Sequence, residues 1–251
     1  MKIDLKKRIN HAIGKAIHDW DMIRENDRIL VGLSGGKDSQ ALLNRLFALQ
    51  KRAPIKFDIF PVHIDAGFDG SFSKDLNAFV NKQYGSLRVE HTNYGVLAHS
   101  EKNTENPCFL CSCLRRKKLF EIAEEINCKK IALGHNKDDI IETLFINIFY
   151  AGKIGTMKPS QSFFNGALDI IRPLSYVDKN DISSFCKMGS LPEFKNNCPS
   201  ADKTKRGEIK EMLETMYTHN KHIKGNIFRA MSNVASDYLL DIKNDRYSKS
   251  A

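Results

Sequence analysis

Short apolar runs alternate along the chain with longer segments in which apolar residues recur every three or four positions. The short runs predict strands, and the periodic segments predict helices. Predicted strands lie at 28–33, 57–63, 87–91, 130–133 and 170–171, and predicted helices at 4–24, 41–49, 72–84, 112–126, 140–150, 179–185 and 208–216. Strands that alternate with helices in this way predict an α/β fold with a doubly wound, mostly parallel sheet covered by helices on both faces.

The pattern also predicts how the chain is divided. The first helix has one apolar stripe, so residues 1–26 are interpreted as an amphipathic helix docked on the main domain. Residues 27–218 are interpreted as that domain, and residues 219–251 as a C-terminal extension. The polar end beyond Arg246 is expected to fray.

The most informative stretch is the turn at residues 34–39, with the sequence Ser-Gly-Gly-Lys-Asp-Ser, which joins the first predicted strand to the next helix. Gly35 and Gly36 lack a Cβ, so the backbone can bend tightly and approach a ligand closely. Backbone N–H groups at the start of a helix favour a bound anion, to which Lys37 adds a positive charge and the two serines add hydroxyls. A phosphate chain is the expected ligand.

Asp38 distinguishes this turn from the common ATPase P-loop. That loop has Ser or Thr directly after the lysine, and a further glycine where this chain has Val31. An acidic residue that faces phosphates indicates a Mg²⁺ ion bound between them. Because ligands of open parallel sheets bind beyond the carboxyl ends of the strands, we expect three segments to meet in one crevice: 34–39, 63–65 and 134–139.

The composition is typical of a globular protein in water, since 41% of the 251 residues are hydrophobic. No apolar run has the length needed to cross a bilayer. The charged N-terminus lacks the core of a signal peptide, so a cytoplasmic location is expected. The formal net charge of +9 favours a polyanionic partner, nucleic acid above all, although a basic solvated surface explains the same charge.

Six cysteines in a chain expected in the cytoplasm argue against a disulfide scaffold and for metal or redox chemistry. Cys108 and Cys111 form a CxxC pair, Cys113 follows closely, and Cys198 stands alone far downstream. The remaining two lie in apolar or helix-end settings and are interpreted as buried small hydrophobes: Cys128 and Cys186.

The CxxC pair is expected just before a helix. The helix N-terminus and the arginines that follow are expected to lower the pKa of both thiols, which favours the thiolate. A redox dithiol, a zinc site and an iron–sulfur site are all compatible with this pattern, although a structural zinc ion prefers four ligands in two pairs. Three thiolates on an iron–sulfur cluster would leave one iron open to hold sulfide or substrate.

The turn at 34–39 resembles the Ser-Gly-Gly-x-Asp-Ser signature of the PP-loop ATP-pyrophosphatase superfamily. Further stretches are similar to the tRNA 2-thiocytidine synthetases, a family within it, and the resemblance covers nearly the whole chain. These stretches are Cys108-x-x-Cys111 with Leu114-Arg115-Arg116, the segment from Ile131 to Leu144, Ile171-Arg172-Pro173-Leu174, and Asn226-Ile227-Phe228-Arg229-Ala230. The chain departs from the family at Cys198, where many members carry a second CxxC pair, and at the additional Cys113.

The resemblance implies a fold and a reaction. The fold is a PP-loop domain of the adenine nucleotide alpha hydrolase type. In the reaction, ATP adenylates the carbonyl of a cytidine in the tRNA anticodon loop, and sulfur then replaces the oxygen to give 2-thiocytidine. The resemblance also implies Mg²⁺, a homodimer, a sulfur donor such as a cysteine desulfurase, and an oxygen-labile [4Fe-4S] cluster on Cys108, Cys111 and Cys198.

The motifs and the resemblance together give the expected site residues. We expect ATP to contact Leu33, Ser34, Gly35, Gly36, Lys37, Asp38, Ser39, His63, Ile64, Asp65, Gly134, Asp139 and Arg172. Catalysis is assigned to Lys37, Asp38, Asp139, Cys108, Cys111 and Cys198, with Asp38 and Asp139 at Mg²⁺. Contacts with tRNA are assigned to Arg115, Arg116 and Lys117.

Each assignment has a structural alternative. Asp138 can cap the following helix, His63 and His135 can bond the backbone at strand ends, and Arg172 can form a surface ion pair. Two other functions also stay open. One is another PP-loop ligase, of the lysidine or thiouridine type, with a structural metal at the cysteines. The other is a non-catalytic, redox-sensing RNA-binding protein.

Overall fold

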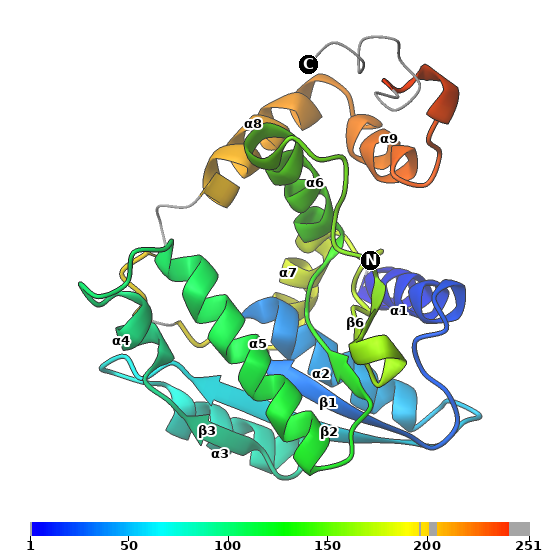
Figure 1. Ribbon diagram of the computed structural model, residues 1–251. Coiled ribbons are helices and arrows are strands. Elements are labelled where there is room, and N and C mark those ends of the chain that lie inside the picture. Colours follow the sequence, from blue (N-terminus) through cyan, green and yellow to red (C-terminus); the bar gives the residue numbers. More distant parts are fainter. Residues whose placement is uncertain (1, 196, 201–204, 241–251) are drawn as a thin grey trace.

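A six-stranded sheet forms the centre of the computed structural model, which describes residues 2–195, 197–200 and 205–240 (Figure 1). The polar end beyond Arg246 lies outside the described residues. The strand order is β3-β2-β1-β4-β6-β5. The strands are β1 (Asp27–Leu33), β2 (Phe57–Asp65), β3 (Arg88–His91), β4 (Lys130–Ala132), β5 (Ser160–Phe163) and β6 (Leu168–Ile171).

Every strand pairing except that of β5 with β6 is parallel, so the predicted doubly wound, mostly parallel sheet is confirmed. The chain moves from β1 to β2 and β3 on one side and then crosses to β4 on the other. The order therefore reverses at the carboxyl ends of β1 and β4, which is where open α/β sheets bind ligands.

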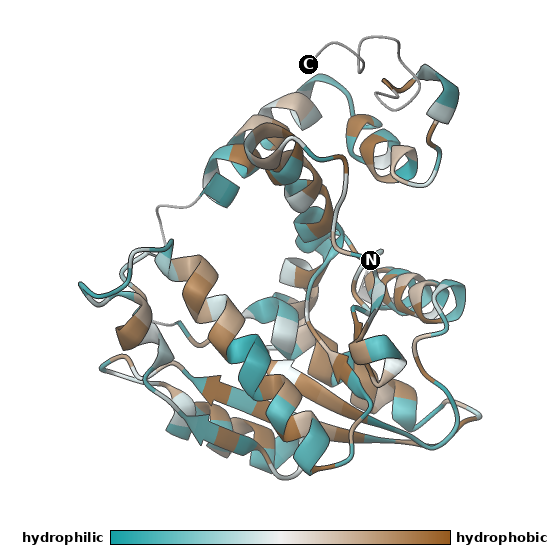
Figure 2. Cartoon of the chain, viewed as in Figure 1, coloured by the Kyte–Doolittle hydropathy of each residue, from teal (hydrophilic) through white to brown (hydrophobic). Residues whose placement is uncertain are grey.

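Helices cover both faces of the sheet, as predicted. Those that lie against it or at its edge are α1 (Lys2–Asp19), α2 (Lys37–Gln50), α3 (Ser73–Tyr84), α4 (Tyr94–Ala98), α5 (Pro107–Glu125) and α7 (Lys179–Met188). On one face, α1, α2 and α7 share a core with residues such as Leu42, Ile29 and Ile182. On the other face, α5 packs Leu119 and Ile122 on the sheet. Figure 2 shows hydrophobic residues along the central strands between these layers.

A smaller helical unit extends beyond the edge of the sheet (Figure 1). It consists of α6 (Lys137–Ala151), α8 (Lys205–His219) and α9 (Ile223–Ala230), which pack around Ile141, Ile209 and Leu213. Two 3-10 turns complete the described elements, η1 (Phe164–Gly166) and η2 (Ser236–Tyr238). Among the described residues, no helix is both long enough and apolar enough to cross a membrane.

Several element boundaries differ from the prediction. Helix α1 ends at Asp19 rather than near residue 24, and Asp21 adopts a positive φ of 46° in the turn that follows. Helix α5 begins at Pro107, five residues earlier than predicted, because the Asn106 side chain accepts a hydrogen bond from the Phe109 N–H and proline is favoured in the first turn. The CxxC pair therefore lies within the first turns of this helix and not before it.

Candidate nucleotide and thiol site

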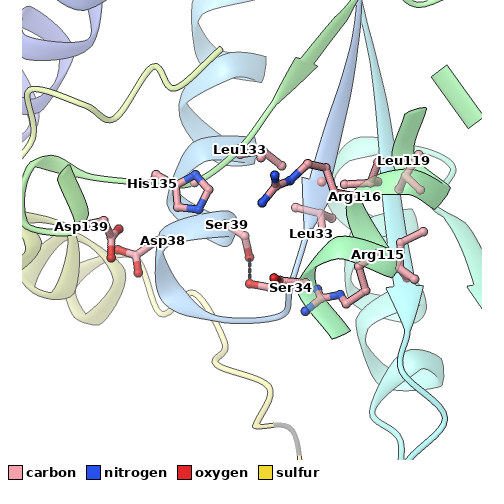
Figure 3. Close-up of a pocket in the computed structure, with 15 residues that line it drawn as sticks. Leu33, Ser34, Asp38, Ser39, Arg115, Arg116, Leu119, Leu133, His135 and Asp139 are labelled. Carbon is pink, nitrogen blue, oxygen red and sulfur yellow. Dashed lines mark hydrogen bonds between the residues drawn. The ribbon is translucent and has the colours of Figure 1, made fainter. Parts of the chain in front are cut away.

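A cavity of about 340 Å³ opens at the carboxyl ends of β1, β2 and β4 (Figure 3). Helix α5 forms the wall of the cavity opposite α2. The lining residues are Gly32, Leu33, Ser34, Asp38, Ser39, Val62, Ile64, Ser112, Arg115, Arg116, Leu119, Leu133, Gly134, His135 and Asp139. The three segments that we expected to meet do so, because all three strands end on the same edge of the sheet.

The glycine-rich turn is tightly packed. Gly35 has a φ of 85°, and a Cβ at this position would lie only 2.6 Å from the Phe72 ring. The Ser34 hydroxyl donates to Ser39 Oγ over 3.3 Å, and the Ser39 hydroxyl donates to the Gly36 carbonyl over 2.8 Å. Gly36 is the N-cap of α2 and makes no side-chain cap. The first N–H groups of α2 are thus oriented toward the cavity end of the helix, where an anion is favoured.

Gly134 brings the end of β4 against the start of α2. A Cβ on Gly134 would lie 2.9 Å from the backbone nitrogen of Ser39 and 3.0 Å from the carbonyl carbon of Asp38. Both of these are backbone atoms, which cannot move aside as a flexible side chain can. A glycine is therefore required for the close approach that shapes the floor of the cavity.

Two carboxylates lie side by side at one end of the cavity, Asp38 and Asp139 (Figure 3). Asn136 connects them: its amide donates to Asp38 Oδ1 over 3.1 Å, and its backbone N–H donates to Asp139 Oδ2 over 2.9 Å. Burial, followed by the nearby Asp139 charge, raises the pKa of Asp38. A pair of neighbouring carboxylates of this kind is suited to a bound cation. Arg206 of α8 meets the other Asp139 oxygen at 3.0 Å.

The wall opposite the turn is basic. Arg115 and Arg116 extend from α5 into the cavity, and His135 faces them from the end of β4 (Figure 3). Arg172 is buried behind His135 and donates from Nε to His135 Nδ1 over 3.3 Å, so a neutral His135 ring carries its proton on Nε2. Burial and then Arg172 lower the pKa of His135. His135, in the loop between β4 and α6, is thus a neutral hydrogen-bond donor.

Two residues expected at ATP have structural partners instead. The His63 Nδ1–H donates to the Leu33 carbonyl over 2.7 Å. The residues on either side of His63, Val62 and Ile64, line the cavity, and His63 does not. The backbone-bonded alternative for His63 is therefore what the structure contains. Asp65 accepts hydrogen bonds from Ser71, Ser73 and the Gly67 N–H. Although burial alone would raise its pKa, these bonds lower the pKa of Asp65 to about 2.

The structure divides the expected ATP residues into two groups. Those that line the cavity are Leu33, Ser34, Asp38, Ser39, Ile64, Gly134 and Asp139. Those outside the lining are Gly35, Gly36, Lys37, His63, Asp65 and Arg172. Lys37 Nζ lies 2.8 Å from Glu193 Oε2. Asp138 does not cap α6; it accepts from the Lys179 N–H at the start of α7 over 2.8 Å.

Three thiols gather at the start of α5. Cys108 is exposed and Cys111 half-buried, and Cys198 affects the pKa of both from the segment between α7 and α8. His99 of the α4–α5 region lies 4.0 Å from Cys198 Sγ and 2.8 Å from the Ser200 hydroxyl. Among the residues that the structure describes, no three His, Cys, Asp or Glu side chains are placed to hold a single metal ion.

The expectation that these thiols have a lowered pKa is wrong. Burial raises the pKa of Cys108, and it raises that of Cys111 by more than Arg115 lowers it. The metal-free thiols of Cys108 and Cys111 are thus protonated near neutral pH, and a bound metal would have to displace those protons. Cys128 and Cys186 are buried, and burial raises the pKa of each to about 11, which confirms that they are inert small hydrophobes.

Helix α5 connects the thiols to the cavity. Cys111 is followed directly by Ser112, which lines the cavity, and Arg115 one turn later lines it too. Arg115 also lies close enough to Cys111 to influence its pKa. Arg116 faces the cavity as well, and Lys117 is exposed outside it. Two of the three residues assigned to tRNA therefore line the cavity, and the third does not.

The chain is similar to known proteins along nearly its whole length. The model of the PP-loop domain family matches residues 1–216. A tRNA-cytidine(32) 2-sulfurtransferase of Geotalea uraniireducens is 39% identical over 239 residues, which cover 93% of this chain and 94% of that protein. A protein of the same name from Shewanella denitrificans is 41% identical, over 94% of this chain and 74% of its own.

The chain therefore belongs to the PP-loop family and, within it, to the tRNA-cytidine(32) 2-sulfurtransferases, which are tRNA sulfurtransferases. The resemblance found from the motifs is thereby confirmed. Among solved structures, the U34-tRNA thiolase NcsA from Methanococcus maripaludis, which contains a [4Fe-4S] cluster, has the same fold with a TM-score of 0.75. It is 23% identical, and the match covers 94% of this chain and 80% of that one.

Proposed function

We propose that the protein thiolates a cytidine of tRNA in an ATP-dependent reaction, at the position that the names of its relatives give as 32. The observation that carries this proposal is the position of α5. One helix brings two of three clustered thiols and two cavity-lining arginines together. A base activated in this cavity would lie beside the source of its sulfur, with no large movement of the chain.

ATP is proposed to bind across the carboxyl ends of β1 and β4. The start of α2 and the hydroxyls of Ser34 and Ser39 would hold the pyrophosphate end, and Lys37 would be drawn to it by charge. Asp38 and Asp139 would hold Mg²⁺, an ion that is commonly bound by one or two carboxylates together with substrate phosphates. The raised pKa of Asp38 supports this, because burial and then the Asp139 charge disfavour its charged form, and a bound cation would offset both effects.

A [4Fe-4S] cluster fits the donor set of Cys108, Cys111 and Cys198. The ligand sulfurs of such a cluster bind different irons, so they need not converge on one point as the ligands of a single ion do. When bound, a cluster with three protein ligands would supply one open iron at which sulfur can be held.

In the proposed reaction, the cytosine carbonyl oxygen attacks the α-phosphate of ATP, and pyrophosphate leaves. This step is needed because a base carbonyl oxygen is a poor leaving group. Sulfur at the oxidation level of sulfide then attacks the carbon that bears this oxygen and loses its proton, and AMP departs with the base oxygen. Arg115, Arg116 and the Nε2–H of His135, which line the cavity, would stabilise the negative charge that develops on the phosphate.

The remaining partners are proposed from the names of the relatives and from the charge of the chain. tRNA is the proposed macromolecular substrate, and the net charge of +9 supports a polyanionic partner. Arg115, Arg116 and Lys117 are proposed tRNA contacts, of which Lys117 is the one exposed outside the cavity. A homodimer, a cysteine desulfurase as sulfur donor and a cytoplasmic location complete the proposal.

The test is anaerobic purification with iron and sulfide analysis, followed by incubation with ATP, Mg²⁺, a sulfur source and unmodified tRNA. Mass spectrometry of the tRNA nucleosides should reveal a thiolated cytidine, together with AMP and pyrophosphate. A protein that holds stoichiometric zinc and no iron, and forms no thionucleoside, would contradict the proposal and favour another PP-loop ligase. RNA binding without any release of AMP would favour a non-catalytic role.

A further inference from the structure

An exposed aromatic side chain lies between two of the clustered thiols. Phe109 follows Cys108 within the CxxC pair and is 59% exposed. The helix fixes its backbone, because the Phe109 N–H donates to the Asn106 side chain over 3.2 Å and the Phe109 carbonyl accepts from the Ser112 hydroxyl over 2.8 Å. Its ring belongs to none of the three apolar cores that the described residues form. Packing within the protein therefore does not account for an aromatic residue here.

Phe109 extends the row of α5 residues that line the cavity. Helical residues three or seven positions apart lie on the same face. Ser112 and Arg116, three and seven residues after Phe109, both line the cavity, as does Leu119 (Figure 3). Ser112 is the first α5 residue in that lining, and Phe109 precedes it by one turn. The periodicity of the helix thus puts Phe109 at the rim of the cavity, beside the thiols.

The charges near this rim favour RNA as the partner of the ring. Arg116 lies two turns further along α5, and the next residue, Lys117, is exposed outside the cavity. Proteins that bind single-stranded RNA combine basic side chains, which bind the phosphates, with aromatic rings on which bases stack. A second copy of this chain would instead bring the same formal net charge of +9 to this surface, and the two charges repel.

We propose that Phe109 stacks on the target cytosine of tRNA and holds that base at the rim of the cavity, next to the thiols. The basic residues of α5 then bind the backbone, and Phe109 binds the base itself. This inference rests on the proposed function and deepens it, because the residues assigned to tRNA so far are all basic. It adds a contact whose strength depends on the base and not on charge.

The test measures binding of unmodified tRNA to the full chain, purified anaerobically, by fluorescence anisotropy without ATP. Phe109→Ala should weaken binding about five- to hundredfold, as expected for the loss of one stacked base. Phe109→Trp should keep the wild-type affinity, whereas Phe109→Leu, which is apolar but has no ring, should lose it as the alanine variant does. The iron content of every variant is measured to show that the thiol site is intact.

Phe164→Ala is the matched control. Phe164 is 63% exposed, close to the value for Phe109, and lies in η1 just before β6. Because β6 runs parallel to β4, whose carboxyl end borders the cavity, Phe164 lies at the opposite end of the sheet. This variant should bind tRNA as the wild type does.

Two further measurements separate stacking from charge. Stacking releases no counterions, so Phe109→Ala should leave the slope of the logarithm of the binding constant against the logarithm of salt concentration unchanged. Lys117→Gln should make that slope shallower by about 0.7 to 0.9. A tRNA that lacks only the target base should bind the wild type and Phe109→Ala equally, because the partner of the ring is missing.

An unchanged affinity in Phe109→Ala, or wild-type affinity in Phe109→Leu, would overturn the inference. An equally large effect of Phe109→Ala on the tRNA without the target base would overturn it too. If the ring covers a second copy of the chain instead, Phe109→Ala would alter the sedimentation of the tRNA-free protein and leave the tRNA affinity unchanged. A wild type that does not bind tRNA would reject the proposed function itself, whereas tRNA binding that does not depend on Phe109 rejects only this role.

Discussion

Glu142 offers the sharpest quantitative test of the electrostatics around the site. It lies on α6, next to the helix turn that carries Asp139, and its side chain is only 4% exposed. Its Oε2 makes no hydrogen bond, and Arg206 approaches it no closer than 3.7 Å. Burial, and then the neighbouring Asp139 and Asp138 charges, raise the pKa of Glu142 to about 7, although Lys179 and Arg206 oppose this. Replacement by Gln keeps the shape and removes the titration.

The magnitude follows from the two pKa values. An ordinary glutamate has a pKa of 4.5, and the folded value is about 7. At about 1.4 kcal/mol per pKa unit, the difference corresponds to about 3 kcal/mol. Because the folded pKa is raised, the folded state binds the proton more tightly than the unfolded chain. The resulting stability is fully present below about pH 4.5 and is lost as the pH rises through about 7.

The assay is urea unfolding of the wild type and Glu142→Gln at a series of pH values between about 5 and 8. The free energy of unfolding of the wild type should fall relative to that of the variant by up to about 3 kcal/mol across this range. The comparison depends only on the change with pH, so a constant cost of the Gln side chain does not matter. A difference between the two proteins that stays constant over the whole range would refute the reasoning.

Three further predictions concern the site and its support. Gly134→Ala should weaken ATP binding about tenfold in calorimetry, because the new Cβ would lie 2.9 Å from the backbone of α2. Gly155→Ala is the control: a Cβ there meets nothing within 4 Å, so the affinity for ATP should not change. Cys111→Ser should lower the iron content of anaerobically purified protein to a small fraction of the wild-type value, whereas Cys113→Ser should retain it. Asp65→Asn should lower the free energy of unfolding by about 2 kcal/mol at neutral pH, because the pKa of Asp65 is lowered to about 2 in the folded state. This contribution to stability is present above about pH 4 and is lost as the pH falls toward 2. Denaturant titrations in which the difference between the two proteins does not shrink on acidification would contradict the prediction.

The parts of the fold that depend on local pattern could be predicted from the sequence. Apolar runs identified five of the six strands, and the alternation with helices gave the parallel sheet. Strand β5, with the sequence Ser-Gln-Ser-Phe, has no apolar run and pairs at the sheet edge, so nothing local marks it. The early start of α5 depends on a cap at Asn106, which follows a stretch with no periodic signal.

The ends of the predicted strands were enough to predict which segments form the cavity, but not which way each side chain points. The rule for parallel sheets correctly gathered the segments around Ser34, Ile64 and Gly134 in one cavity. The rule does not say which way a side chain points, and His63 turned out to bond the Leu33 carbonyl instead. Partners far apart in sequence, such as Lys37 with Glu193, depend on how loops pack and leave no local signal.

The central claim is that the base oxygen is activated by AMP within this cavity before sulfur replaces it. The most direct test follows the fate of that oxygen, in tRNA whose target cytidine carries oxygen-18 at its carbonyl. After an anaerobic reaction with ATP and a sulfur source, mass spectrometry should find the heavy oxygen in AMP, in an amount equal to the thiolated cytidine formed. Thiolated cytidine accompanied by AMP without the label would show that the oxygen leaves by another route, and would contradict the account.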